Sequence, residues 1–462
     1  MERPFAWKMY QKAEVEAVMA FAAEYREFLS RCKTERECVA FFKAQAIKAG
    51  FRDLQDIIAQ GITLHPGDCV FADNRGKYLA MYIIGTEPIE KGMNILASHI
   101  DSPRLDLKQN PLYEDCEMAM LDTHFYGGIK KYLWVTLPLA LHGVVVRKDG
   151  TRVDVCIGED PDDPVLGVSD LLIHLSREMM EKPASKVVEG EALNILVGNR
   201  PLADETDENG KTKEIRDAVK ANILSILREK YNIEEEDFIS AEIEVVPAGS
   251  ARDYGLDRSM IMGYGQDDRC CAYPTFAAML AVKAPRKTCV CLLTDKEEVG
   301  CVGATGLHSR FFENATAEIM EACSEDASRK LRRALENSKA LTCDVTAAFD
   351  PNYPSAVEKQ SSAFFGHGLV FSKYKANDTD SDFMAEVRRI LDENGVFYQT
   401  GELGKVNSGS DGSIAYIMAR YNMRVLDSGI AILNMHAPWE IISKADLYEA
   451  RKGYIAFLQK AS

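Results

Sequence analysis

Two adjacent glutamates, Glu297 and Glu298, stand directly after a short apolar run and are candidates for chemistry. The run TCVCLL (288–293) is small, apolar and β-branched, which is typical of a buried strand. Adjacent side chains point in divergent directions, so one glutamate could hold a metal ion while its neighbour faces the bound water. The alternative is that both carboxylates lie in the first turn of a helix, where the dipole favours negative charge.

A histidine and an aspartate two residues apart form a second polar cluster, in ASHIDSP (97–103). A metal-ligating imidazole usually donates its other N–H to a carboxylate or a carbonyl. His99 could therefore be a ligand and Asp101 the group that orients it. The alternative is a solvated turn in which Asp101 caps the chain and Pro103 ends the strand.

Aspartates stand at two further places that could take part in a metal site. Asp267 and Asp268 precede an apolar helical run in GYGQDDRCCAYPTFAAML (263–280). They could cap that helix, or one of them could bridge two cations with its two oxygens. Asp344 lies within an expected strand, where a carboxylate is costly unless it is paired or bound to metal. An edge strand that turns Asp344 toward water is the alternative.

The last cluster is LNMHAPWE (433–440), in which a histidine follows an apolar strand. This histidine could be a ligand or a packed core residue. Oxygen and imidazole donors without thiolate suit zinc, manganese or cobalt. Five ligands with one shared carboxylate would form a two-metal site with ions ~3.5–4 Å apart. The candidate ligands are His99, Asp344, the histidine of this cluster (His436), one of the two aspartates Asp267 and Asp268, and one of the two glutamates Glu297 and Glu298.

The elements that must position these residues follow from the periodicity of the chain. Strands are expected at 76–85 and 92–98, and helices over 10–60, with a break near Ser30–Thr34. Beyond about residue 262, helical stretches alternate with apolar strands, as in an α/β sheet covered on both faces. Ligands in such sheets bind outside the carboxyl ends of the strands. Polar clusters at several strand ends could therefore meet in one crevice.

The region between these parts has a different character. Residues 130–158 look β-rich with a turn at Asp149-Gly150. Residues 202–214 are polar and loop-like, and a helix is expected at 215–231.

Composition excludes several classes of protein. The chain has 462 residues and a net charge of −16, which argues against nucleic acids and anionic membranes as partners. No apolar run is long enough to span a membrane, and the N-terminus lacks the pattern of a signal peptide. The 12 cysteines are scattered without paired spacings, so reduced thiols in a cytoplasmic protein are expected.

The clusters resemble the motifs of the M18 metallo-aminopeptidases, the aspartyl aminopeptidase family, over nearly the whole chain. Within the family, the sequence around residues 434–452 is more similar to the bacterial branch than to the eukaryotic enzymes. The segments that carry the resemblance are ASHIDSPRLDLK (97–108), YGGI (126–129), DLLIHLSR (170–177), GQDDR (265–269), KEEVG (296–300), CDV (343–345), DPNYP (350–354) and NMHAP (434–438).

This resemblance implies an α/β fold: a mixed-sheet dizinc exopeptidase catalytic domain with an inserted β-rich dimerisation domain. The catalytic domain would be discontinuous, over 1–106 and 247–462. The insertion, at 107–246, would join subunits into a tetrahedral dodecamer. The resemblance also implies two divalent ions per subunit, most simply zinc, with cobalt and manganese as alternatives.

The roles that the resemblance implies are specific. His99 and Asp344 would hold one metal, Glu298 and His436 the other, and Asp267 would bridge them. Asp101 would orient His99, and Glu297 would be the general base that takes a proton from water and passes it to the leaving amine. The expected reaction is removal of N-terminal residues from peptides. Alternatives are a deacylase or carboxypeptidase with the same metal site and, in another class, a non-catalytic assembly protein.

The substrate-binding residues are less clearly marked. Eukaryotic members that prefer Asp or Glu have histidines near the substrate, where this chain has Asp170, Ala347 and Asp350. Two carboxylates there would repel an acidic side chain, so a strict aspartyl preference is not expected. Lys373 could bind an acidic group or be solvated. Gly409, in NSGSDGSIAY (407–416), could line the substrate cleft or belong to a turn that caps a helix.

Overall fold

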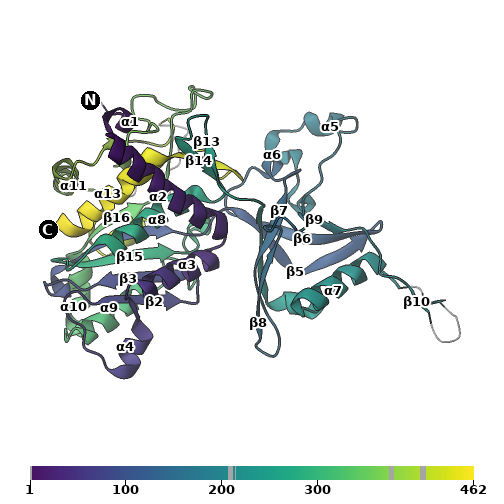
Figure 1. Cartoon of the computed structure of the whole chain (residues 1–462), viewed down its shortest axis with the longest axis horizontal. Coiled ribbons are helices and arrows are strands. Elements are labelled where there is room, and N and C mark those ends of the chain that lie inside the picture. Colours follow the sequence, from purple (N-terminus) through teal and green to yellow (C-terminus); the bar gives the residue numbers. More distant parts are fainter. Residues whose placement is uncertain (1–2, 207–211, 214, 374–378, 406–412) are drawn as a thin grey trace. The chain divides into compact units, whose positions relative to one another are not determined.

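The computed structural model describes residues 3–206, 212–213, 215–373, 379–405 and 413–462. The chain forms two compact units, which are described separately here (Figure 1). The first unit contains the residues up to Ser102, Ala251–Met435 and Trp439–Ser462. The second unit contains Pro103–Ser250 together with the short segment His436–Pro438.

A mixed sheet of nine strands forms the centre of the first unit. Its four middle strands run parallel to one another: β15 (Thr288–Thr294), β4 (Met93–His99), β16 (Lys339–Cys343) and β20 (Arg424–Gly429). The flanking strands are β1 (Arg52–Asp53), β2 (Cys69–Asn74) and β3 (Tyr78–Ile83) on one side, and β18 (Leu369–Ser372) and β19 (Tyr398–Thr400) on the other.

Helices cover both faces of this sheet, so the side chains of its middle strands are buried on both sides (Figure 1). In β4, Leu96 packs into one core, and its neighbours Ile95 and Ala97 pack into the other. The first core contains side chains of α2 (Lys12–Arg31), α3 (Glu35–Lys48), α8 (Gln266–Ala281), α11 (Ser381–Glu393) and α13 (Lys444–Lys460). The second contains side chains of α4 (Leu54–Gln60), α9 (Phe311–Ala322), α10 (Ala327–Glu336) and α12 (Ala415–Ala419).

The expected helical break near residues 30–34 is confirmed. Helix α2 ends at Arg31, and α3 begins at Glu35. The Thr34 hydroxyl accepts the Glu37 N–H, and the Glu37 carboxylate accepts the Thr34 N–H. This reciprocal capping box stabilises the start of α3. The region up to residue 60 is not continuously helical, however, because the short strand β1 pairs with β2 before α4 begins.

A smaller five-stranded sheet lies in the same unit: β13 (Arg252–Tyr254), β14 (Met260–Gly263), β22 (Glu440–Ser443), β21 (Ala431–Leu433) and β17 (Thr346–Ala347). The apolar stretch 423–433 contains two strands that belong to different sheets. Its first half is β20 in the nine-stranded sheet, and its second half is β21 in the five-stranded sheet. Local periodicity did not reveal this change of sheet, because both halves are apolar.

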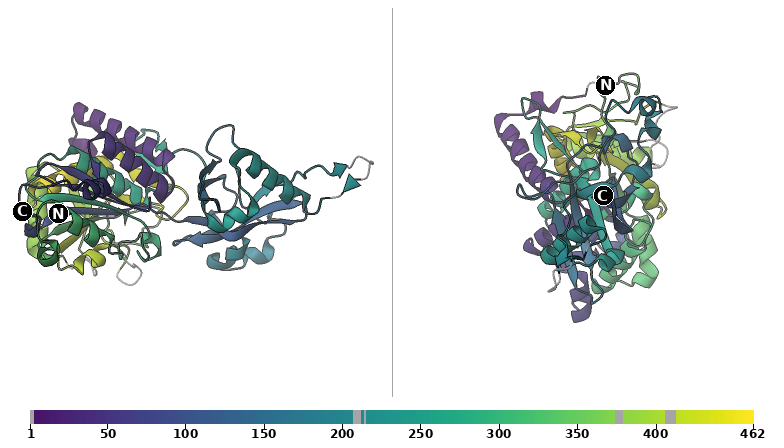
Figure 2. Two further views of the ribbon diagram at one scale, coloured as in Figure 1. Left: turned by 90° about the horizontal axis from the view of Figure 1, so that it is seen from below. Right: turned by 90° about the vertical axis from the view of Figure 1, so that its right-hand side faces the viewer.

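The second unit is built on a six-stranded antiparallel sheet in the order β8-β7-β12-β5-β6-β9. Helix α7 (Ala218–Tyr231) contacts β5, β6 and β9 (Figure 2). The strands are β5 (Arg104–Asp115), β6 (Met118–Tyr126), β7 (Leu139–Val146), β8 (Arg152–Ile157), β9 (Ile195–Gly198) and β12 (Ala241–Pro247).

Most of the elements expected in this region are present. The turn at Asp149-Gly150 joins β7 to β8, where Asp149 accepts the Thr151 N–H. The start of the β-rich stretch differs from the expectation, because Lys131–Leu133 is a short 3-10 helix. Glu205–Thr206 and Thr212–Lys213 pair as short strands, although 202–214 was expected to be a loop.

None of the helices in the described part of the chain combines the length and the apolar character that a membrane crossing requires.

Candidate metal centre

Three polar side chains project from the carboxyl ends of three neighbouring parallel strands. His99 is the last residue of β4 and pairs in register with Thr294, the last residue of β15. Glu297 follows β15 within a few residues, and Asp344 follows β16 directly. Asp344 was expected within the strand, but its N–H donates to the Ser428 carbonyl just beyond the strand end. The edge of the sheet thus gathers residues that are far apart in sequence.

His99 is the centre of this group, and it is buried. Its Nδ1 lies 3.0 Å from the Asp101 carbonyl oxygen and 3.3 Å from the Asp101 carboxylate. Both partners are acceptors, so Nδ1 carries the proton and donates it. Nε2 is left to face three carboxylate oxygens: Asp267 Oδ1 at 3.2 Å, Asp344 Oδ1 at 3.7 Å and Glu297 Oε2 at 3.9 Å.

Asp101 also holds the glutamate pair. Its two carboxylate oxygens accept the backbone N–H groups of Glu297, at 3.1 Å, and Glu298, at 3.2 Å. Glu297–Val299 is a single 3-10 turn, so the helix-terminus alternative for the pair finds no α-helix here. A positive φ at Lys296 (72°) and at Gly300 (89°) bends the chain on either side of the turn. One buried carboxylate therefore orients both the histidine and the glutamate loop.

The electrostatics of the group are those of crowded negative charge. Burial raises the pKa of Glu297 to about 8, and the charges of Asp344 and Asp267 act in the same direction, although His99 opposes them. Burial also raises the pKa of Asp344. Burial lowers the pKa of His99, but hydrogen bonds to Asp101, Asp267 and Asp344 more than offset this and raise it. A cation among these groups would relieve the repulsion.

The donor atoms fit zinc. Ligand atoms of His99, Asp267 and Asp344 lie within 4.8 Å of one another, and so do those of His99, Glu297 and Glu298. Both sets combine one imidazole nitrogen with carboxylate oxygens, which zinc accepts at catalytic sites.

Two carboxylates that sequence reasoning did not assign support this arrangement. Asp268 accepts the backbone N–H of His99, at 3.3 Å, and Glu440 accepts that of Asp267, at 3.1 Å. Ser102 donates its hydroxyl to the Asp267 carbonyl, at 2.8 Å. The only signal in the sequence was proximity, since Asp268 follows Asp267 and Glu440 closes the cluster LNMHAPWE.

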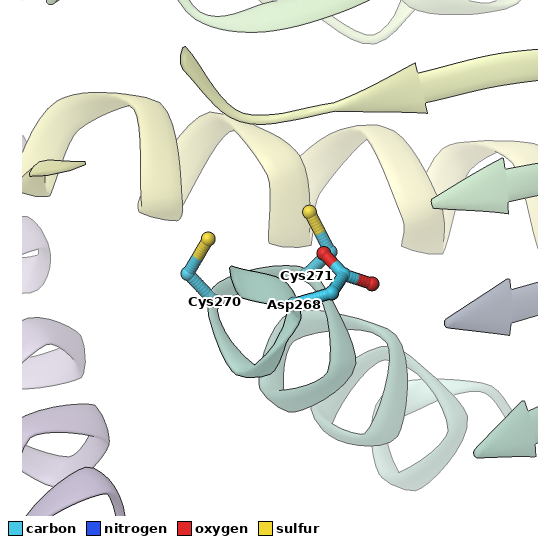
Figure 3. A group of neighbouring side chains, drawn as sticks. All are labelled: Asp268, Cys270 and Cys271. Carbon is cyan, nitrogen blue, oxygen red and sulfur yellow. The ribbon is translucent and has the colours of Figure 1, made fainter. Parts of the chain in front are cut away.

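Asp268, Cys270 and Cys271 form a further set of possible ligand atoms, all buried (Figure 3). Cys271 lies beside the Asp268 carboxylate, and the ligand atoms of all three residues lie within 4.8 Å of one another. Burial raises the pKa of Cys270 to about 12 and that of Cys271 well above its usual range. Both cysteines belong to the first hydrophobic core of the unit.

The remaining site candidates are His436, Asp170, Lys373 and Gly409. His436 belongs to the segment grouped with the second unit, and its Nδ1 lies 2.9 Å from the Gly128 carbonyl oxygen. Asp170, also in the second unit, is exposed and accepts the N–H of Leu171. Lys373 is exposed directly after β18. Gly409 lies outside the described residues.

Comparison with known proteins identifies the family. Residues 28–458 match the family described as aminopeptidase I zinc metalloprotease (M18). A probable M18 family aminopeptidase 1 from Clostridium acetobutylicum is 58% identical, with coverage of 98% of this chain and 97% of the relative. A probable M18 family aminopeptidase 1 from Thermotoga maritima is 42% identical, with coverage of 100% and 99%.

Solved structures agree with the sequence relatives. The crystal structure of aminopeptidase I from Clostridium acetobutylicum matches with a TM-score of 0.91 and 56% identity over 100% of both chains. That of the Thermotoga maritima M18 aminopeptidase matches with a TM-score of 0.92 and 41% identity, again over 100% of both. The expected fold class, a mixed α/β unit with a β-rich insertion, is confirmed. The chain belongs to the M18 family of zinc metallo-aminopeptidases.

Proposed function

We propose that the chain removes N-terminal residues from peptides at a co-catalytic two-metal centre, with a glutamate as general base. The observation that carries this proposal is the environment of His99, whose Nε2 faces three carboxylates while its Nδ1 is held by Asp101. Such a set of donors is stable only around positive charge, and the family is one of zinc enzymes.

The proposed ligands divide between two ions. His99 and Asp344 would hold one ion, Glu298 and His436 would hold the other, and Asp267 would contribute to both. In the sequence, the segment His436–Pro438 is preceded and followed by residues of the first unit. The Nδ1 of His436 faces a carbonyl oxygen, so its Nε2 is the atom proposed to bind metal.

The residues around the ions have separate tasks. When bound, zinc supplies Lewis acidity toward the scissile carbonyl and lowers the pKa of a water molecule. Glu297 takes a proton from that water and returns it to the leaving amine. Asp101 keeps the His99 imidazole oriented and holds the backbone of Glu297 in place.

The proposed substrate is a peptide with a free α-amino group, which the carboxylates of the centre would attract. Strict preference for acidic N-terminal residues is not part of the proposal. Asp170 and Asp350 add negative charge where eukaryotic relatives have histidines, and Lys373 is the one cation among the substrate candidates.

We further propose that the second unit joins subunits, in a dodecamer at full assembly. It exposes a run of large apolar side chains: Leu171 (45% exposed), Leu172 (54%), Ile173 (70%) and Leu175 (68%). Such patches mark interaction sites. A solved structure of S. cerevisiae mApe1, 20% identical to this chain, is a dodecamer.

Assembly is tested by Ile173→Asp with Leu175→Asp, examined by light scattering at several protein concentrations. The double variant is expected to give a smaller particle than the wild type. Leu256→Asp is the control, because Leu256 is fully exposed but belongs to the first unit. If the double variant forms a particle of the same size as the wild type, these apolar side chains do not join subunits.

The activity is tested with matched peptides that have free or acetylated N-termini. Release of the N-terminal residue from free peptides, lost after chelation and restored by zinc, is the expected result. Equal cleavage of acetylated peptides would favour a deacylase or carboxypeptidase instead. Absence of bound zinc, manganese or cobalt, together with no cleavage, would favour a non-catalytic assembly protein.

A further inference from the structure

A cavity of about 890 Å³ lies in the first unit, and its lining contains none of the proposed metal ligands. Its walls come from the segment 307–310, from α9 and α10, and from the end of α12 with the following turn. The volume is within the range of small-molecule binding sites.

The deepest lining side chains of the cavity are apolar. Leu307, Leu335 and Ile417 are 2%, 4% and 3% exposed, and they belong to the second core of this unit. This floor could contact the hydrocarbon part of a ligand.

The rim of the cavity is cationic, in contrast to the chain as a whole. Arg310, Arg332 and Arg420 line it together with two glutamates, Glu313 and Glu336. The chain carries a net charge of −16, so a local excess of positive charge is an exception to its overall composition.

Arg332 differs from its neighbours on α10. Lys330 and Arg333 each pair with Glu90, at 3.0 Å. Arg332 lines the cavity and forms no ion pair within 4 Å with any residue that the structure describes. Its guanidinium is therefore available to an anion in the cavity.

Arg420 also forms no ion pair with an acidic residue among those that the structure describes, and it lies beside an imidazole. Its guanidinium lies 3.2 Å from Nδ1 of His308, and Nε2 of the same ring lies 3.1 Å from the Tyr416 hydroxyl. A guanidinium only donates, so Nδ1 must accept, and the imidazole proton lies on Nε2. Arg310, in contrast, pairs with Glu313 at 3.3 Å.

We propose that this cavity binds a small organic anion, with Arg332 and Arg420 holding a phosphate or carboxylate group and the apolar floor contacting the attached hydrocarbon. The guanidinium fork matches the oxygens of both groups, which is why arginine recognises them in preference to neutral ligands. The proposal does not rest on the peptidase function, since the cavity and the metal centre share no residue.

The test is calorimetric titration of the full chain with phenyl phosphate and with benzoate, which separate phosphate from carboxylate recognition. Phenol and inorganic phosphate serve as the neutral and the hydrocarbon-free probes. The wild type is expected to bind one of the two aromatic anions and to bind it more tightly than either of these probes. Arg332→Gln and Arg420→Gln are each expected to weaken that binding about tenfold or more.

Arg329→Gln is the matched control, because Arg329 lies on the same helix, is exposed, and pairs with Asp326 instead of lining the cavity. It should bind the anion as the wild type does. Thermal unfolding of each variant checks that the fold is kept, and Arg332→Lys should retain part of the affinity. Failure of the wild type to bind either anion at about 10 mM would overturn the proposal. Equal binding by the Arg332→Gln/Arg420→Gln double variant, or equal binding of phenol, would also overturn it.

Discussion

The carboxylates around His99 and the arginine-lined cavity both lie in the first unit, but their charges are opposite. At the metal centre, carboxylates crowd around one buried histidine, and backbone N–H groups fix both Asp101 and Asp268. At the cavity, the arginines are exposed, and two of them have no anionic partner among the described residues.

The difference indicates how strongly each place should hold a ligand. Buried like charges are costly, so a cation that neutralises them gains a large free energy and is held in a defined geometry. Exposed cations are already hydrated, so an anion gains less and competes with salt. The metal centre is therefore expected to be the tight site and the cavity the weak one.

The largest effect is expected from variants that distinguish the role of Glu297 from that of Glu298. Glu297→Gln should keep the metals and lower kcat by about 10²–10⁴-fold, because the general base is lost. Glu298→Gln should instead lower the metal content, because a ligand is lost. Both are measured by metal analysis with peptide turnover at saturating zinc. Near-native turnover by Glu297→Gln would show that another group moves the proton.

A smaller effect is expected when the orienting carboxylate is changed. Asp101→Asn should weaken zinc binding by about 10–100-fold, because the His99 ring loses the charge that holds its Nδ1 proton. Competition with a zinc-binding dye measures the affinity. Asp68→Asn is the control, since Asp68 accepts the N–H of His65 in an exposed turn. Equal losses in both variants would mean that no specific orientation is involved.

The pH dependence of zinc binding follows from the raised pKa values. The pKa of Glu297 is about 8, and those of His99 and Asp344 are raised as well. Protons thus occupy donor atoms near neutral pH, and zinc must displace them. Zinc affinity should fall as the pH drops from 8 to 6, by about tenfold per pH unit for each proton released. A flat profile would contradict proton competition at this centre.

The smallest effect is expected for the salt dependence of binding, which can be compared directly between the metal centre and the arginine-lined cavity. Raising ionic strength from about 0.1 M to 1 M shortens the Debye length from ~10 Å to ~3 Å. Phenyl phosphate binding at the exposed arginines should weaken several-fold, whereas zinc binding at the buried centre should change by less than about twofold. Both affinities are measured by titration at constant pH. Equal salt dependence would show that the metal centre and the cavity do not differ in how strongly their charges are screened.

The amino-acid sequence by itself determined the types of groups available for chemistry and many of the elements that carry them. Periodicity and capping predicted the apolar strand before Glu297, the strand that ends at His99, and the break between α2 and α3. Composition and motif order were sufficient to identify the family and the mixed α/β fold.

Only the tertiary structure decided which groups touch. The pairing of β15 with β4 aligns Thr294 with His99 across almost two hundred residues, and no local preference encodes that neighbour. The same holds for the hydrogen bond from Glu297 to Asp101 and for the support of His99 by Asp268. It also holds for Arg332, which lines the cavity without an ion pair to any described residue. Local propensity acts within a few residues, whereas these contacts depend on which strands and helices pack together.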